Sequence, residues 1–445
     1  MDRSSSGDGV GAGAFGPEPP RNPLAFPPLP SLRSFLQGSL TFGVFIAGPA
    51  FGAPHVQAQV VDVDLQEVER LARDHSPEWE RFETRFEVFT HREEALVRPA
   101  DPTFGYELEF QGESPRGIYE HALFVEQTFR MPGLGRSLRE RTESRLVGFE
   151  LERTRDRTRW LADTRRGLVQ WAIAERKLER LERVRSLVAE LGTAVRIREE
   201  AGEVSGVERQ LLALTQFQLQ SRMEDLSLER DELRWEWQVR MGLDDRDLRL
   251  AEGIPSRRAL LPEESDVLEW MGESPTLRAE AQAVESARRA RQVEESRRWP
   301  GLDLRAGYRR VSPAWDGFLV GFSIPLPLRE GNARQIQSAR AEERDRILSN
   351  TMLEARESAR VRQALRGAWM RAVHLQEFPE ELTDPDPLLD DLIALYRDGM
   401  ESLPGILSSL VLLTDGYQSY FEQLELYFEG VFQLEALTGR TLIDP

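Results

Sequence analysis

Two stretches of the sequence decide its architecture: "REEAGEVSGVERQL" at 198–211 and "YRDGMESLPGIL" at 396–407. Each places a glycine three residues before a serine, between segments with helical periodicity. Glycine ends a helix in the left-handed conformation, and a serine hydroxyl accepts hydrogen bonds from the first N–H groups of the next helix. The sequence therefore predicts two tight helix reversals, at Gly202 with Ser205 and at Gly399 with Ser402.

The two reversals belong to a tandem repeat that runs through most of the chain. Proline and glycine mark backbone geometry more firmly than other residues, so their spacing tests the repeat. Three proline pairs lie 198 residues apart and two glycine pairs lie 197 residues apart: Pro77 and Pro275, Pro102 and Pro300, Pro115 and Pro313, Gly202 and Gly399, Gly242 and Gly439. A single one-residue deletion accounts for all five pairs. The chain therefore contains a duplicated unit of about 180 residues.

Within each unit the sequence predicts a helix, a β-hairpin and a long helical hairpin, in that order. The first unit covers residues 59–242 and the second covers 264–442, with a polar linker at 243–263. The predicted elements are opening helices at 64–98 and 264–298, β-hairpins at 103–129 and 301–324, and helical turns at 202–205 and 399–402.

The helices after each β-hairpin are too long for a compact domain. Residues 136–198 alone would span about 95 Å as a helix, at 1.5 Å per residue. The second return helix carries an apolar stripe at three- and four-residue spacing: Leu403, Ile406, Leu410, Leu413, Tyr417, Tyr420, Leu424, Tyr427, Val431 and Leu434. Such a stripe packs on another helix along its length. Pro379, Pro385 and Pro387 predict a kink or break in the second outgoing helix.

The predicted strands alternate strictly between apolar and polar residues. In "TFGYELEF" at 103–110 and "LDLRAGYR" at 302–309, apolar residues share one face, and Glu, Asp, Arg and Gly share the other. The residues predicted to face a membrane are Phe104, Tyr106, Leu108, Phe110, Leu302, Leu304 and Tyr308. Soluble hairpins half-buried on the helices fit the same alternation, so periodicity leaves both readings open.

In a membrane, the strands would have to be shared between chains. Strands of about ten residues can cross a bilayer obliquely, but about eight is the smallest number that closes a barrel. Open edges are excluded in lipid, and one chain supplies four strands. Three chains would supply a barrel of about twelve strands.

The composition excludes several classes of function. The chain has 445 residues, a formal net charge of −18 and no cysteine. The acidic balance argues against a nucleic-acid partner, and the lack of cysteine excludes disulfides and thiolate chemistry. The histidines share no metal-ligand spacing, and "PGLGRS" at 132–137 lacks the lysine and the spacing of a phosphate loop. We therefore predict no catalytic residue, no metal site, no cofactor and no enzymatic activity.

The N-terminus has the pattern of a secretory signal. Residues 1–58 form a Pro- and Gly-rich leader followed by an arginine and the apolar run "FLQGSLTFGVFIAGPAFGAP". Small residues at Val56 and Ala58 predict cleavage near Ala58. A membrane anchor is the alternative, but glycine and proline interrupt the run early. No other segment approaches the roughly 18 apolar residues of a membrane helix.

Several stretches resemble the TolC family of outer-membrane efflux proteins. They are "FSIPLPLREGNARQIQSARAEERDRIL" at 322–348, its counterpart "VEQTFRMPGLGRSLRERTESRL" at 125–146, "YRDGMESL" at 396–403 and "LEALTGR" at 434–440. The resemblance covers about residues 60–442. It implies a homotrimer of tandem-duplicated coiled-coil hairpins. A β-barrel in the outer membrane, with four strands from each chain, would continue into a helical α-barrel across the periplasm.

The resemblance also implies a function and partners. Members of the family are passive exit ducts of tripartite efflux pumps or type I secretion systems. They dock on a periplasmic adaptor (membrane fusion) protein, which is attached to an inner-membrane pump of the resistance-nodulation-division or ATP-driven kind. The other class that the sequence allows is a soluble periplasmic coiled-coil scaffold or adaptor, whose hairpins only pack on helices.

For the hairpin tips, the resemblance implies a gate at the periplasmic mouth. The family holds the closed mouth with a tyrosine three residues before the second glycine and an acid six residues after the first. These positions are Tyr396 and Glu208 here, so a hydrogen bond between them is expected as a closed-state latch. Where the family has rings of acidic residues, this sequence has glycine and serine. The negative charge is therefore expected from Asp398 and Glu401.

Overall fold

The structure, a computed structural model, describes most of the chain from residue 60 onward. The described ranges are 60–111, 118–244, 246–251, 261–298, 301–312, 315–325, 332–379 and 386–443. They fall within one structural unit, Gln57–Pro445. The predicted leader and the cleavage site near Ala58 lie outside the described residues, as does the side chain of Phe110.

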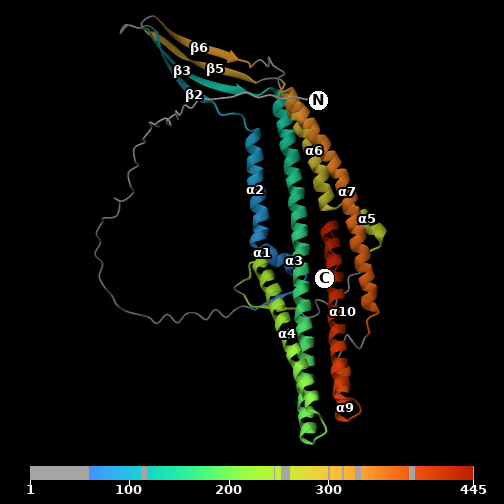
Figure 1. Cartoon of the computed structure of the whole chain (residues 1–445). Coiled ribbons are helices and arrows are strands. Elements are labelled where there is room, and N and C mark those ends of the chain that lie inside the picture. The colour runs from blue at the N-terminus through green and yellow to red at the C-terminus, as the bar shows by residue number, and fades with distance from the viewer. Residues whose placement is uncertain are drawn as a thin grey trace, which may run out of the picture. The chain divides into compact units, whose positions relative to one another are not determined.

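The predicted class, mainly helical with a few strands, is confirmed. Long helices run side by side, and a sheet lies beyond one end of them (Figure 1). The helices are α1 Val68–His75, α2 Pro77–Val97, α3 Pro132–Glu200, α4 Gly206–Met241, α5 Glu264–Met271, α6 Pro275–Ser296, α7 Ala333–Gln376, α9 Asp386–Arg397 and α10 Leu403–Thr438. The strands are β1 Val61–Val63, β2 Thr103–Gln111, β3 Ile118–Phe129, β4 Leu248–Leu250, β5 Leu302–Ser312 and β6 Trp315–Ser323. None of the helices in the described ranges combines the length and hydropathy of a membrane span.

The longest helix, α3, is continuous over 69 residues, which is about 100 Å at 1.5 Å per residue. It begins at Pro132, in the first turn, where a missing N–H costs nothing, and no proline follows before its end. α3 contacts α2 and α6 along its first part, and α4 and α10 along its last part. It therefore connects the sheet end of the molecule with the hairpin tips.

Each predicted opening helix is divided in two. The sequence predicted single helices at 64–98 and 264–298, but α1 ends at His75 before α2, and α5 ends at Met271 before α6. The backbone is extended at Ser76 and Ser274, with ψ of 122° and 129°. Both serines precede a proline, whose ring disfavours the helical conformation of the preceding residue.

The return helices, α4 and α10, end at the points where the opening helices are divided. Gly439, with φ 75°, follows α10 in the left-handed conformation. A Cβ at this position would lie 2.9 Å from Pro275 Cδ, at the start of α6. Only glycine therefore allows the end of α10 to approach the start of α6 so closely. Gly242 has the same conformation at the end of α4, against His75 and Pro77.

The segment predicted as a polar linker, 243–263, contains a strand. β4 pairs in parallel with β1, in a register that places Val61 opposite Leu248. Arg249 adds a two-pronged contact to the Asp62 carboxylate, at 2.7 and 2.9 Å. Strands of three residues are too short to show an alternating pattern, so the sequence did not reveal this pair.

The second outgoing helix is interrupted, as its prolines predict. α7 ends at Gln376, shortly before Pro379, and α9 begins at Asp386. Pro385 lies outside the described residues, and Pro387 falls in the first turn of α9, where it is tolerated. The outgoing segment of the second repeat is therefore divided into α7 and α9, whereas α3, the outgoing helix of the first repeat, is continuous.

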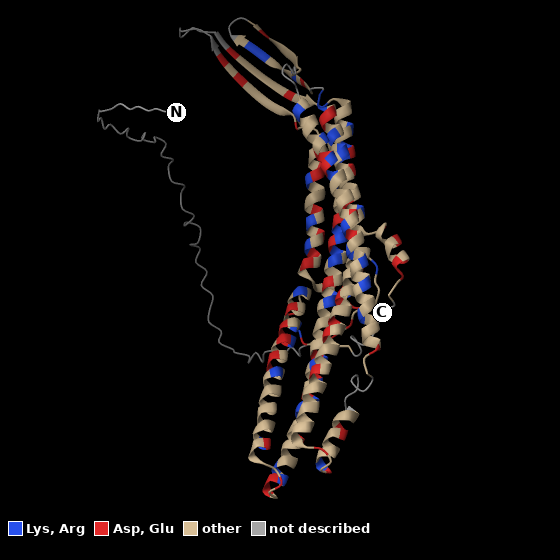
Figure 2. Ribbon diagram, turned by 45° about the vertical axis from the view of Figure 1, so that its right-hand side comes forward, with Lys and Arg blue, Asp and Glu red and all other residues tan. Residues whose placement is uncertain are grey.

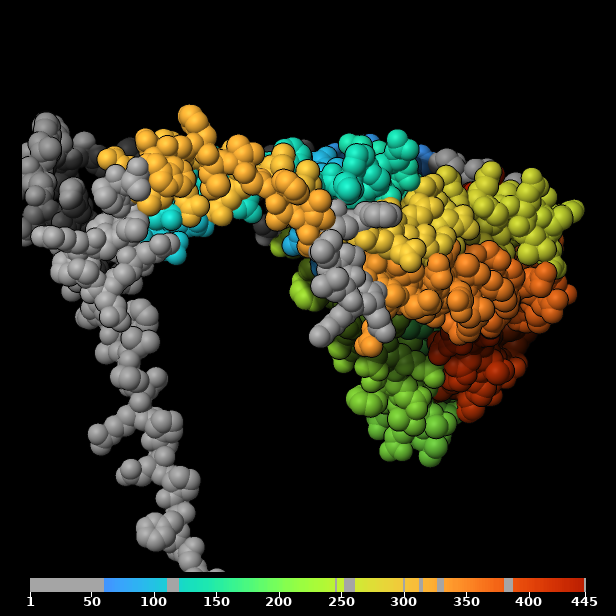
Figure 3. All heavy atoms as spheres, turned by 90° about the horizontal axis from the view of Figure 1, so that it is seen from above, coloured from blue at the N-terminus to red at the C-terminus, as the bar shows by residue number. Residues whose placement is uncertain are grey.

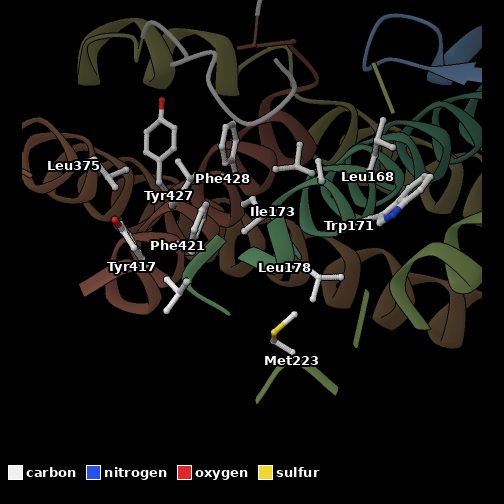
Figure 4. Close-up of a cluster of buried hydrophobic side chains, with 14 of the residues drawn as sticks. Leu168, Trp171, Ile173, Leu178, Met223, Leu375, Tyr417, Phe421, Tyr427 and Phe428 are labelled. Carbon is white, nitrogen blue, oxygen red and sulfur yellow. The ribbon is translucent and has the colours of Figure 1, made fainter. Parts of the chain in front are cut away.

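The main core lies along the contact between α3 and α10. Leu168 and Ile173 of α3 and Phe428 of α10 are buried in one cluster (Figure 4). Nine of the ten residues in the predicted stripe of α10 are buried: Leu403, Ile406, Leu410, Leu413, Tyr417, Leu424, Tyr427, Val431 and Leu434. The stripe therefore forms helix–helix core, as its spacing indicates.

Candidate functional site

The two β-hairpins join into one antiparallel sheet of order β2-β3-β5-β6. The pairing of β3 with β5 runs from Tyr119 opposite Ser312 to Phe129 opposite Leu302. β2 and β6 form the two edges of this sheet. The two repeats therefore contribute equally to one surface.

The register collects apolar side chains on one face of the sheet. One row across the four strands is Phe104, Val125, Ala306 and Val320, and the next is Tyr106, Leu123, Tyr308 and Phe318. The exposed fractions are 92 % for Phe318, 82 % for Val320 and 70 % for Phe104. In a view from above, the strands of the sheet extend to one side of the helices (Figure 3). An exposed apolar surface of this kind marks an interaction site.

Most of the predicted membrane-facing residues lie on this apolar face. Phe104, Tyr106, Leu108, Leu304 and Tyr308 are all exposed, and Leu302 is half-buried at the start of β5. The alternative that the hairpins only pack on helices predicts a covered apolar face. Within the described residues that face is open to the surroundings.

The opposite face of the sheet is polar and contains a contact that the sequence did not reveal. Phe124 lies between Gly105 and Gly307, which are its partners on the two neighbouring strands, and its ring covers Gly105. The Arg305 guanidinium lies 3.2 Å from the centre of that ring and forms an ion pair with Glu107 across β3. A Cβ at Gly105 would overlap the Phe124 ring. The strand alternation places Phe124 on this face, but only the register shows the two glycines beside it.

The two helix reversals share one backbone geometry. Gly202 and Gly399 have φ of 80° and 70°. In the first turn, Gly202 N–H donates to the Glu199 carbonyl and Glu203 N–H donates to the Arg198 carbonyl, both at 2.9 Å. The second turn has the equivalent pair of bonds, to the Tyr396 and Leu395 carbonyls. These paired bonds satisfy the last carbonyls of each outgoing helix.

The two return helices begin with different acidic caps. Ser205 Oγ accepts from Glu208 N–H at 3.3 Å, and the Glu208 carboxylate accepts from Ser205 N–H at 2.8 Å, which forms a capping box. In the second hairpin Ser402 Oγ accepts from the N–H of Gly405, which has no side chain to return the contact. There, Glu401 accepts from Ser402 N–H at 3.1 Å. Glu401 therefore takes the capping role that Glu208 has in the first hairpin.

The hydrogen bond expected between Tyr396 and Glu208 is not formed in this structure. The Glu208 carboxylate caps Ser205 instead. Tyr396 is 2 % exposed, and its hydroxyl has no hydrogen-bond partner among the described residues. The Arg198 guanidinium lies 5.2 Å from the centre of the ring. Burial raises the pKa of the Tyr396 hydroxyl, Arg198 opposes this rise, and the nearby charge of Glu208 adds to it.

The tips carry charges of both signs (Figure 2). Arg198 pairs with Glu203 and Arg209 pairs with Glu199, each at 3.2 Å. Asp398 is exposed on the second tip, beside Gly399. Of the two acids expected to supply negative charge there, Asp398 is open to solvent and Glu401 is used in capping.

We find no candidate metal site in the described ranges. No group of three or more His, Asp or Glu side chains there could hold a metal ion.

No family model and no curated protein matches the chain. Solved structures match its fold across most of its length. CusC, which is described as forming a transmembrane channel, matches with a TM-score of 0.70 at 12% identity over 85% of this chain and 92% of that chain. The outer membrane protein VceC from Vibrio cholerae matches with a TM-score of 0.67 at 13% identity, over 85% of this chain and 96% of that chain. The open state of the Neisseria gonorrhoeae MtrE outer membrane channel matches with a TM-score of 0.67 at 14% identity, over 85% and 89%.

The sheet and the paired helical hairpins therefore define a chain with the fold of outer-membrane channels. The resemblance to the TolC family that the sequence showed is confirmed at the level of this fold.

Proposed function

We propose that the chain is the outer-membrane exit duct of a tripartite efflux pump or type I secretion system. The observation that carries this proposal is the exposed apolar face of the sheet, on a chain with the fold of outer-membrane channels. In lipid this face would contact the hydrocarbon chains. In water it would expose large apolar side chains on all four strands, which is unfavourable. The fold similarity does not favour a soluble scaffold.

The open edges of the sheet support assembly as a homotrimer. β2 and β6 each pair with one strand only within the described residues. Unpaired backbone N–H and C=O groups are costly in lipid, so β2 of one chain would pair with β6 of the next. Three chains then supply about twelve strands, which is enough to close a barrel.

The tips of the helical hairpins are proposed as the gate and as the docking site for a periplasmic adaptor. The residues involved would be Gly202, Ser205, Glu208, Tyr396, Asp398, Gly399, Glu401 and Ser402. A buried hydroxyl without a partner is unfavourable, and the Tyr396 hydroxyl is near enough to Glu208 for that charge to affect its pKa. Transfer of the Glu208 carboxylate from Ser205 to the Tyr396 hydroxyl would form the closed-state latch.

The remaining parts of the proposal concern partners and location. An inner-membrane pump, either of the resistance-nodulation-division or of the ATP-driven kind, would act through the adaptor. The chain would reach the outer membrane through an N-terminal signal and would extend into the periplasm. Transport through the duct would be passive, without a nucleic-acid partner or cofactor.

Purification of the full chain from membranes tests this function. We expect it to fractionate with the outer membrane, to sediment as a trimer in detergent, and to conduct ions in planar lipid bilayers. A soluble monomer after signal removal would contradict the proposal. A membrane-bound trimer that never conducts would contradict the duct but leave the trimer in place.

A further inference from the structure

The apolar face of the sheet becomes polar toward the end that is farthest from the helices. β3 ends at Phe129 and α3 begins at Pro132, so the residues that precede Phe129 on β3 lead away from the helices (Figure 1). The row of Tyr106 and Tyr308 is the last apolar row in that direction. The next row on the same face, here called the polar row, consists of Leu108, His121, Arg310 and Asp316.

Two tyrosine hydroxyls reach from the last apolar row into the polar row. The Tyr106 hydroxyl lies 2.7 Å from Nδ1 of His121. The Tyr308 hydroxyl donates to the Asp316 carboxylate. A tyrosine with its ring among apolar side chains and its hydroxyl on a polar partner is typical of a membrane–water interface. The two tyrosines therefore mark one boundary of the apolar face.

The charges of the polar row agree with this boundary. Arg310 and Asp316 are both exposed. On the lipid face of a barrel, a charged side chain costs much more at the bilayer midplane than near the interface. From Leu302 to Arg310 the strand advances about 26 Å, at about 3.3 Å per residue. A tilted strand of that length covers most of an apolar band about 25 Å high. The polar row therefore lies where lipid tails meet headgroups.

The guanidinium of Arg310 is not taken up by the sheet itself. Its neighbour Arg309 lies on the opposite face and forms an ion pair with Glu120. Arg310 forms no ion pair within the part of the chain that the structure describes. Asp316 is its direct partner on β6, but the Asp316 carboxylate accepts from the Tyr308 hydroxyl. Arg310 therefore presents its N–H groups to the surroundings.

His121 supplies a second donor beside Arg310. The two residues are direct partners on β3 and β5, which places their Cβ atoms about 5 Å apart. With the Tyr106 hydroxyl donating to Nδ1, the neutral imidazole carries its proton on Nε2. Nε2 is then a donor next to the guanidinium. The Tyr106 contact also fixes the orientation of the ring.

We propose that Arg310 and His121 bind the phosphate group of a lipid in the outer leaflet. A guanidinium can form two parallel hydrogen bonds with phosphate oxygens, and Nε2 of His121 adds a third. The acyl chains of the same lipid contact the apolar rows beside the site, which a free anion could not do. The inference rests on the proposed function, because the helices of the duct lie in the periplasm and the polar row then faces the outer leaflet.

Titration of the delipidated trimer with lipid A, a phosphorylated glycolipid, tests the site. Binding is followed by native mass spectrometry in detergent. We expect Arg310→Gln combined with His121→Gln to weaken lipid A binding at least about tenfold. The matched control combines Arg309→Gln with Glu120→Gln, which removes an ion pair from the opposite face of the same strands. The control should bind lipid A like the unmodified protein.

Two further measurements identify the ligand group. Lipid A without its phosphates should bind the unmodified protein about as weakly as intact lipid A binds the double variant. Inorganic phosphate should compete with lipid A only weakly, because it lacks acyl chains. Equal binding of lipid A with and without phosphates would overturn the inference. Equally strong binding of inorganic phosphate would show a site for free phosphate and overturn the lipid assignment.

The outcomes also separate this inference from the proposed function. If the trimer conducts ions but the double variant and the control bind lipid A equally well, the phosphate site is wrong and the duct stands. If the unmodified chain is a soluble monomer, the proposed function fails, and this inference fails with it. Arg310→Lys gives a second measurement should the double variant not assemble. Its ammonium cannot form two parallel bonds, so binding should weaken several-fold, and unchanged binding would overturn the role of Arg310.

Discussion

The Ser274 hydroxyl donates a hydrogen bond to the Leu437 carbonyl at 2.7 Å and so joins the start of α6 to the end of α10. Ser76 makes the same contact with the Arg240 carbonyl at 2.9 Å, at the start of α2. The last carbonyls of a helix have no partner within the helix, so each serine satisfies one of them. In each repeat, the start of one helix (α2 or α6) is thereby joined to the end of the return helix (α4 or α10).

This junction makes Gly439 sensitive to substitution. We expect Gly439→Ala to destabilise the protein by more than Gly399→Ala, although both glycines have a positive φ. The left-handed conformation costs an alanine about 1–2 kcal/mol at either position. At Gly439 the new Cβ also meets Pro275, whereas nothing lies within 4 Å of a Cβ at Gly399. Denaturant midpoints of the two variants measure the difference, and equal midpoints would show that the junction relaxes freely.

The apolar sheet face predicts a strong effect of charge. Leu304→Arg places a cation on the proposed lipid face, at a cost of about 2–4 kcal/mol if the residue lies near the bilayer midplane. We expect the amount of trimer in the outer membrane to fall at least about tenfold. Ser323→Arg is the control, because Ser323 pairs with Asp303 and belongs to the polar face. If both variants assemble equally well, the apolar face does not meet lipid.

The buried hydroxyl at the tip predicts a change in gating without a loss of stability. Tyr396→Phe removes a hydroxyl that has no partner among the described residues, so the melting temperature should stay close to that of the unmodified protein. If the latch to Glu208 forms in the closed state, its loss costs about 0.5–1.5 kcal/mol there and raises the open population several-fold. Single-channel recording in planar bilayers measures this population. Tyr420→Phe, on α10, is the control, and an unchanged open population for Tyr396→Phe would rule out the latch.

The contact between α3 and α10 predicts a dependence on pH, because Arg165 of α3 pairs with the buried Glu435 carboxylate of α10 at 2.7 Å. Burial raises the pKa of Glu435 above its usual 4.5, although Arg165 and two backbone N–H groups oppose this rise. Because the pKa is higher in the folded state, the contribution of this group to stability is fully present below pH 4.5 and is lost as the pH rises through the raised value.

Glu435→Gln removes this titration. The unmodified protein loses the contribution of Glu435 as the pH increases from about 4 to 7, whereas the variant has no such contribution to lose. We therefore expect the stability gap, by which the unmodified protein exceeds the variant in free energy of unfolding, to narrow over this range. Denaturant unfolding at several pH values measures this difference. A gap that widens with increasing pH would show that Arg165 outweighs burial and holds the pKa of Glu435 below its usual value.

Local features of the sequence were enough to predict the repeated elements. Gly202 and Gly399 end helices because the left-handed conformation is available to glycine at little cost, and the serine that follows each turn caps the next helix whatever lies around it. The faces of β2 and β5 follow from the two-residue period of a strand, which also needs no distant partner.

Contacts between distant segments could only come from the tertiary structure. The pairing of β3 with β5 joins strands from different repeats, and nothing local in either strand selects the other. The position of Phe124 between two glycines likewise depends on register across three strands. Turns and strand faces are determined by a residue and its near neighbours, whereas these contacts depend on where separate elements meet.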